Sequence, residues 1–158
     1  MPKNWLEKEG NWGLNRGDNS ISEKSKVIQS SGKRKTAIAR AVLKFPAKGQ
    51  IKVNNVPLDL YEPEIMRERI KEIIEIANNE KLSKCDIKIN VRGGGKMGQT
   101  EAVRIAMAKA IYKFIKTKTI ERSFRDYDDS LLSGDSRRTE PKKFGGKKAR
   151  ARRQKSFR

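Results

Sequence analysis

The stretch Asp86-Ile-Lys-Ile-Asn-Val-Arg-Gly-Gly-Gly-Lys-Met-Gly-Gln-Thr100 joins two kinds of secondary-structure pattern. From Asp86 to Arg92 apolar and polar residues alternate, which predicts a strand with one buried face. After the glycines, apolar residues recur every three or four positions, which predicts a helix from about Thr100 to Thr117. A strand that leads through glycines into an amphipathic helix indicates an α+β fold. The stripe of this helix is Val103, Met107, Ala110, Ile111 and Phe114, and the residues that lie off it, on an exposed basic side, are Lys109, Lys113 and Lys116.

The chain before this stretch repeats both patterns. Thr36 to Phe45 is rich in aliphatic residues and predicts a strand, and Gln50 to Asn54 predicts a second strand that returns beside it as a hairpin. A helix is expected to start near Glu64, because Pro63 suits a first helical turn. Residues 120–132 fit either a short helix or a strand. We therefore expect the order ββαβα, a small mixed sheet covered by two helices on one face. The stripe of the earlier helix is Met66, Ile70, Ile73, Ile74 and Ala77, with Asn78 and Asn79 at its end.

Charge divides the chain into three parts. The 158 residues carry a formal net charge of +19, and residues 137–158 hold eleven Lys or Arg against one acid, a net +10. We expect a flexible N-terminal extension at 1–30, an α/β domain at 31–136 and an extended basic tail at 137–158. A segment with so many like charges needs a polyanionic partner, and RNA is the first one to consider.

Composition excludes several classes of protein. No run of about 18 apolar residues could span a bilayer, and no apolar signal-peptide core follows Met1, so we expect a cytoplasmic protein without a membrane partner. The chain has no histidine and one cysteine, which excludes a structural zinc site and a histidine-based catalytic triad. Cys85 is expected to be a small apolar filler.

The glycine-rich loop Gly93-Gly-Gly-Lys-Met-Gly98 matches the dinucleotide-binding pattern and nearly matches a P-loop. Gln99 stands where the P-loop lysine should be, and no clear strand with a suitable acid follows the helix. Backbone amides at a helix N-terminus nevertheless favour an anion, and Arg92 and Lys96 flank the loop. An RNA phosphate is therefore one interpretation of the loop, and a tight crossover between strand and helix is the other.

Two charged clusters remain. Aspartates at 126, 128, 129 and 135 could serve a magnesium-dependent nuclease, but arginines at 122, 125, 137 and 138 make ion pairs the favoured interpretation. Lys33-Arg34-Lys35 is either a solvated strand edge or, as we favour, a phosphate contact. We predict no enzymatic activity, no metal and no cofactor. The alternatives are an RNA- or nucleotide-processing enzyme and a free RNA chaperone or non-specific DNA-binding protein.

Four segments, in this order, are Ser31-Gly-Lys-Arg-Lys-Thr-Ala-Ile-Ala-Arg40, Gly93-Gly-Gly-Lys-Met-Gly-Gln99, Arg137-Arg-Thr-Glu-Pro-Lys-Lys-Phe-Gly-Gly146 and Ala149-Arg-Ala-Arg-Arg-Gln-Lys-Ser-Phe-Arg158. Together they closely resemble the family of protein nine of the small ribosomal subunit, in the version shared by archaea and eukaryotes. The resemblance runs from about residue 27 to the end of the chain. The chain departs from the family at Ser136, where a proline is usual, at Lys147-Lys148, where Pro-Gly is frequent, and at residues 1–26, which have no recognised counterpart.

The resemblance implies a fold like the second domain of ribosomal protein five and a place in the cytoplasmic ribosome. It implies binding to rRNA in the head of the small subunit, beside other head proteins, without enzymatic activity or independent homo-oligomers. It also implies that the tail extends through rRNA toward the tRNA in the peptidyl site. The residues expected at rRNA are Lys33, Arg34, Lys35, Arg40, Arg92, Lys96, Arg137, Arg138, Lys142, Lys143, Lys147, Lys148, Arg150, Arg152 and Arg153. Those expected near the tRNA are Lys155, Ser156, Phe157 and Arg158.

Overall fold

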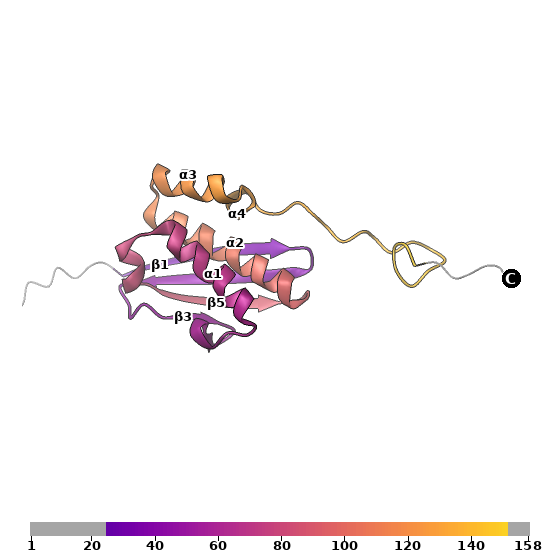
Figure 1. Ribbon diagram of the computed structural model, residues 1–158, viewed down its shortest axis with the longest axis horizontal. Helices are drawn as coiled ribbons and strands as arrows, with labels where there is room; N and C mark the ends of the chain where they lie inside the picture. The colour runs from indigo at the N-terminus through magenta and orange to yellow at the C-terminus, as the bar shows by residue number, and fades with distance from the viewer. Residues whose placement is uncertain (1–24, 152–158) are drawn as a thin grey trace, which may run out of the picture.

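A five-stranded mixed sheet forms the centre of the protein, and its helices lie together on one side of it (Figure 1). The computed structural model describes residues 25–151. The α+β class and the mixed sheet are therefore confirmed. The strands are β1 (Lys26–Arg34), β2 (Ala37–Phe45), β3 (Ile51–Val53), β4 (Val56–Pro57) and β5 (Asp86–Arg92), and the α-helices are α1 (Glu64–Ala77), α2 (Lys96–Ile115), α3 (Lys118–Tyr127) and α4 (Ser130–Ser133). Short 3-10 helices occupy Leu58–Leu60 and Glu80–Lys84.

The strand order is β1-β2-β5-β3-β4, in which only the β3–β5 pair is parallel. The predicted hairpin between β2 and β3 is therefore wrong, because β5 lies between them. After β2 the chain passes the start of β5, where the Ala47 amide donates to the Lys84 carbonyl over 2.7 Å and the Gln50 amide donates to the Asp86 carboxylate over 2.9 Å. Strand β5 has the strongest apolar alternation in the sheet, and a central position buries its apolar side chains fully.

Strand β1 was not predicted, and it takes in residues 26–30, which the sequence analysis assigns to the N-terminal extension. Its residues on the helix side include Ser30 and Gly32, too small to give an apolar alternation. The reason is the close approach of α2, since a Cβ atom at Gly32 would lie 2.3 Å from the Ala102 carbonyl oxygen. The Ser30 hydroxyl donates to the Ala106 carbonyl over 2.6 Å. Small residues in β1 therefore allow the helix backbone to rest directly on the strand.

Helices α1 and α2 confirm the two predicted apolar stripes, and α3 and α4 add a further layer against them. Helix α2 begins at Lys96, one turn earlier than predicted, so that Gly98 lies within its first turn. Its residues from Ala102 to Ala108 are buried on every side, because the sheet covers one side and the other helices cover the rest. The expected exposed basic side is therefore limited to the last turns of α2, where Lys113 and Lys116 are exposed and Lys109 is half-buried.

The hydrophobic core lies between the helices and the helix side of the sheet. Alternate residues of β2 and β5 enter it, and Phe124 of α3 and Leu131 of α4 close it from outside. None of the helices between residues 25 and 151 has the length and apolar character needed to cross a bilayer. Beyond α4 the chain leads away from the domain without helix or strand as far as Ala151 (Figure 1).

Candidate nucleic-acid interface

The side of the sheet that faces away from the helices carries a set of positive side chains. Successive residues of a strand point to opposite sides, so burial of Ala39 and Ala41 in β2, and of Ile87 and Ile89 in β5, leaves their neighbours on the uncovered side. We call the six cations on that side the basic face. They are Lys33 of β1, Arg40 and Lys44 of β2, Lys52 of β3, and Lys88 and Arg92 of β5.

The strand register brings these six residues together from four strands. Lys33 and Arg92 both pair with Ile38, one from each side, so the three residues form one row across the sheet. Lys52 and Lys88 are direct partners on parallel strands, which places two like charges next to each other. Adjacent like charges destabilise a sheet by themselves. Lys52 and Lys88 therefore do not stabilise the isolated domain through each other.

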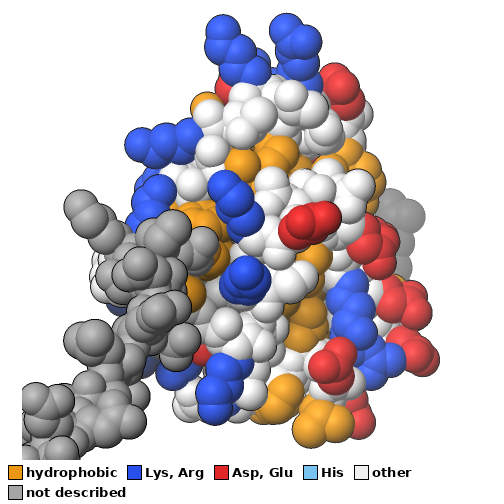
Figure 2. Space-filling view, turned by 90° about the vertical axis from the view of Figure 1, so that its left-hand side faces the viewer, with side chains coloured by type: hydrophobic (Ala, Val, Ile, Leu, Met, Phe, Trp, Pro, Cys, Tyr) orange, Lys and Arg blue, Asp and Glu red, His pale blue; other side chains and the backbone are white. Residues whose placement is uncertain are grey.

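Charge pairing differs between the two sides of the protein. No member of the basic face makes an ion pair with any other described residue, whereas the helix layer contains several. The one acid among the outward-facing residues of these strands is Asp86, which accepts the Gln50 amide. In Figure 2, Lys and Arg side chains gather mainly toward the left and top of the molecule and Asp and Glu mainly toward the right. The positive potential of the basic face is therefore little compensated from within residues 25–151.

The glycine loop packs against the turn between β1 and β2. Gly93 and Gly94 have φ of 74° and 69°, and a Cβ atom at Gly93 would lie 2.6 Å from the Thr36 carbonyl oxygen. Gly95 caps α2 without a side-chain hydrogen bond, and the first amides of a helix have no partner within it. The four arginines of the adjoining groove are all ion-paired, Arg69 and Arg104 with Glu101, and Arg34 and Arg137 with Asp135. The structure therefore supports the tight crossover and makes the loop a less positive site than the basic face.

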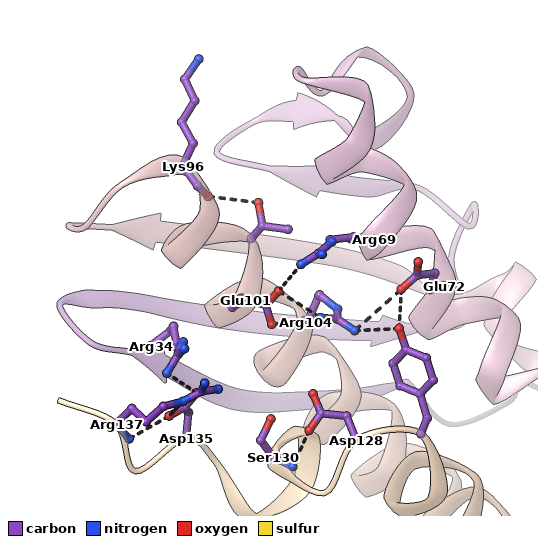
Figure 3. Close-up of polar contacts among 12 residues, drawn as sticks. Arg34, Arg69, Glu72, Lys96, Glu101, Arg104, Asp128, Ser130, Asp135 and Arg137 are labelled. Atoms are coloured by element: carbon purple, nitrogen blue, oxygen red, sulfur yellow. Dashed lines mark hydrogen bonds and ion pairs between the residues drawn. The ribbon is translucent and has the colours of Figure 1, made fainter.

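Three other predicted contacts beside this loop differ in their surroundings. Lys96 is exposed, and Figure 3 shows its side chain pointing away from the polar cluster. Arg34 is half-buried at the end of β1 and pairs with the Asp135 carboxylate. Lys35, in the turn, is exposed and adopts a positive φ of 52°. RNA contact remains a prediction for all three.

Asp135 fastens the start of the tail to the domain (Figure 3). Its side chain, 6% exposed, lies between Arg34 and Arg137. The Arg137 guanidinium donates to both carboxylate oxygens over 2.9–3.2 Å, and the Arg137 amide donates to one of them over 2.8 Å. These hydrogen bonds, together with the charge of Arg34, hold the pKa of Asp135 below its usual value. Asp135, Arg34 and Arg137, which we call the tail junction, fix where the basic tail leaves the domain.

The described part of the tail is mostly solvent-exposed and mostly unpaired. Glu140 pairs with Lys143 over 3.2 Å and with Arg150 over 2.9 Å. The other predicted rRNA contacts up to Ala151 make no ion pair with a described residue: Arg138, Lys142, Lys147 and Lys148. The remaining predicted contacts lie outside the described residues: Arg152, Arg153, Lys155, Ser156, Phe157 and Arg158.

Several groups considered for catalysis have structural roles. Asp135 makes the predicted ion pair with Arg137, whereas the prediction is wrong for Asp126, Asp128 and Asp129, which make no ion pair with a described residue. Asp128 instead accepts the Ser130 amide over 2.9 Å. Within residues 25–151, no three His, Cys, Asp or Glu residues come together as a metal site would require. Cys85 is buried as predicted, and burial raises the pKa of its thiol to about 11. The thiol is therefore protonated and unreactive at neutral pH.

Sequence reasoning found half of the basic face. Lys33, Arg40 and Arg92 are among the predicted rRNA contacts, whereas Lys44, Lys52 and Lys88 are not. Two of these could have been found from the alternation of side chains along a strand. Lys44 is an even number of residues from Arg40 in β2, and Lys88 is an even number from Arg92 in β5, so each pair points to the same side of the sheet.

One family model and three relatives of this chain agree on one family. The family described as "Ribosomal protein S9/S16" matches residues 32–158. "Small ribosomal subunit protein uS9" of Desulfurococcus amylolyticus is 46% identical over 140 residues, which cover 88% of this chain and 98% of that protein. The proteins of the same name from Methanothrix thermoacetophila and Pyrobaculum aerophilum are 47% and 44% identical, covering 84% and 87% of this chain and 99% and 96% of theirs.

Proposed function

Because the chain belongs to the ribosomal protein S9/S16 family, and is thus a structural constituent of the small ribosomal subunit, we propose that it binds rRNA through the basic face and the tail. Its place is the cytoplasmic ribosome, and its partners are rRNA of the subunit head and neighbouring head proteins. The protein contributes positive charge and shape to the assembly, and it catalyses no reaction.

One observation carries this proposal: six cations from four strands gather on one side of the sheet, and none of them makes an ion pair with a described residue. Four tail cations, Arg138, Lys142, Lys147 and Lys148, also make no ion pair with a described residue. Lys143 and Arg150 of the tail pair with Glu140, and most arginines of the helix layer are paired as well. Phosphates supply most of the affinity when a protein binds nucleic acid, because their neutralisation releases counterions. A surface whose cations are held free of internal partners is suited to that purpose.

The tail extends this binding beyond the domain. The tail junction at Asp135 gives the tail a fixed starting point, and the residues that follow are rich in Lys and Arg. Eighteen residues from Pro141 to Arg158 span at most about 60 Å when fully extended. We propose that the tail runs along rRNA and that Lys155 to Arg158 come close to the tRNA in the peptidyl site.

Two nested truncations test this proposal. Removal of residues 141–158 deletes nine Lys or Arg, so the dependence of log K on log salt for rRNA binding should flatten by up to about 0.7–0.9 per lost phosphate contact. Removal of residues 155–158 alone should leave assembly into small subunits intact and weaken tRNA binding in the peptidyl site.

Each truncation has an outcome that would contradict the proposal. An unchanged salt slope after removal of residues 141–158 would exclude the tail as a major phosphate binder. Lost assembly with normal tRNA binding, after removal of residues 155–158, would show that the last residues serve assembly. Co-sedimentation of the full-length chain with small subunits at high salt separates a ribosomal constituent from a free RNA chaperone.

A further inference from the structure

We propose that the basic face binds the sugar–phosphate backbone of double-helical RNA, an inference that rests on the proposed rRNA binding and assigns a kind of RNA to this surface. Three of its six residues, Lys44, Lys52 and Lys88, are cations that the sequence did not associate with RNA. Three properties of this surface favour such a ligand: its charge, the lack of aromatic residues at the outward positions of its strands, and the spread of its cations over the sheet.

Charge selects an anionic ligand. All six members lie outside every ion pair of the described chain, and Lys52 and Lys88 stand side by side on neighbouring strands. Strands in a sheet are about 4.8 Å apart, so these two ammonium groups repel each other until an anion lies between them. Arg40 lies between Ser31 and Asn90, whose polar side chains can donate further hydrogen bonds to phosphate oxygens.

The composition of this side of the sheet disfavours unpaired bases. Proteins that bind single-stranded RNA on a sheet stack the bases on aromatic side chains. The outward positions of β1, β2, β3 and β5 contain no aromatic residue, and their apolar members are aliphatic: Val27, Ile38 and Val42. The same lack of aromatic anchors disfavours a protein partner, because protein interfaces are centred on such residues. Contacts to phosphate and ribose are what this surface can make.

The arrangement of the cations favours a double helix over a single strand. From the row of Ile38 to Lys44 the basic face extends about 20 Å along β2, and from β1 to β3 it extends about 14 Å across the strands. The charges therefore spread in two dimensions over four strands and do not follow a single line as one backbone would. An RNA double helix presents the phosphates of two strands at once and is recognised mostly by its shape and backbone.

The test compares two triple variants of the full-length chain with equal charge loss. The first is Lys44→Gln, Lys52→Gln and Lys88→Gln on the basic face. The matched control is Lys81→Gln, Lys118→Gln and Arg122→Gln, three exposed cations beyond that face which make no ion pair with a described residue. The ligands are a 20-base-pair RNA duplex, poly(U) with the same number of nucleotides, and poly-glutamate.

We expect the basic-face variant to bind the duplex at least tenfold more weakly at 100 mM salt, with the salt slope lowered by about 2–3 for three lost phosphate contacts. The control variant should stay within about twofold of wild type. In wild type, the duplex should protect Lys44 and Lys88 from acetylation and leave Lys81 and Lys118 reactive. Circular dichroism and an unchanged Tm verify that both variants fold.

Other outcomes would overturn the inference. Equal weakening by the two variants would show that only total charge matters, a larger loss for poly(U) would indicate single-stranded RNA, and a larger loss for poly-glutamate would indicate an acidic protein. The truncation of residues 141–158, measured in the same assay, separates the proposed rRNA binding by the protein from the proposed duplex binding by the basic face. If it weakens duplex binding while the basic-face variant does not, the basic face is not the site and rRNA binding by the protein still stands.

Discussion

The two sides of the central sheet differ in what their side chains meet. On the helix side, Ser30 and Gly32 of β1 lie against the backbone of α2. The Ser30 hydroxyl donates to the Ala106 carbonyl, and no space remains for a side chain at Gly32. On the other side, alternate residues of the same strands carry the basic face, whose cations have no partner among the described residues. One sheet therefore has a side shaped by packing and a side shaped by charge.

Two arginines, Arg104 and Arg40, differ in the same way as the two sides of the sheet. Arg104 in α2 is 6% exposed, and its guanidinium donates to Glu101 over 2.9–3.0 Å and to the Tyr127 hydroxyl over 3.1 Å (Figure 3). Arg40 in β2 is exposed and has no such acceptor among residues 25–151. A buried charge is tolerated only when it is paired, whereas an exposed charge is solvated by water and needs no partner within the protein, so it is available to a ligand. Position, and not residue type, decides whether an arginine stabilises this fold or binds its partner.

The largest expected effect comes from filling the packed side. Gly32→Ala places a methyl group 2.3 Å from the Ala102 carbonyl oxygen and 2.5 Å from the Ala106 amide nitrogen. Both contacts are backbone atoms of α2, so the helix must move away, and we expect the free energy of unfolding to fall by about 3 kcal/mol. Ser31→Ala, the neighbouring residue that faces outward, should change it by less than about 0.5 kcal/mol. Urea denaturation monitored by circular dichroism measures both values, and similar values would contradict the close seating of α2.

A smaller effect on the free energy of unfolding is expected when one arginine is removed from the helix layer and, in a second variant, one from the basic face. Arg104→Ala leaves Glu101 without its nearest cation and opens a space beside Tyr127, which should cost about 2 kcal/mol, less than for a fully buried pair because Glu101 is 23% exposed. Arg40→Ala should leave stability within about 0.5 kcal/mol. In RNA binding the order should reverse, with the measured Kd raised by Arg40→Ala and unchanged by Arg104→Ala. Equal losses of affinity would remove the distinction between the two sides.

The elements with a strong local pattern were predictable from the sequence. The apolar alternation of β5 and the stripe of α1 gave their bounds almost to the residue, because one side of each is buried and the other is wet. Strand β1 lacks that signal, since the residues under α2 had to be small. The pairing of β3 with β5 was also out of reach, because no local pattern tells a strand which distant partner will lie beside it.

The candidate interface was predictable where cations cluster in the sequence and not where folding brings them together. Lys33 belongs to a run of three basic residues, and the tail is basic along its whole length. Lys52 and Lys88 are isolated in the sequence and become neighbours only through the strand register. Conversely, Arg34 resembles its basic neighbours in the sequence, yet it lies at the helix side of β1 and holds Asp135. Lys33 and Arg34 differ because consecutive residues of a strand point to opposite sides of the sheet.

The smallest expected effect concerns the tail junction, where the packed side meets the charged tail. Asp135→Asn keeps an acceptor for the Arg137 amide but removes the charge that pairs with Arg34 and Arg137, so we expect a loss of about 1 kcal/mol. The folded state lowers the pKa of Asp135, so the stabilisation is complete above the ordinary aspartate pKa of about 4 and is lost as the pH falls through the lower folded value. The stability difference between wild type and variant should therefore be constant from pH 7 to about pH 5 and shrink below pH 4.

Asp126→Asn is the matched control, because Asp126 is exposed and makes no ion pair with a described residue. A constant difference between wild type and Asp135→Asn down to pH 2 would show that the carboxylate charge does not hold the junction. The tail junction also connects the packed domain to the charged tail, because Arg34 is the last residue of β1 and Arg137 is the first residue of the tail. If Asp135→Asn changes the salt slope of rRNA binding while Asp126→Asn does not, the fixed exit of the tail contributes to binding beyond its charge.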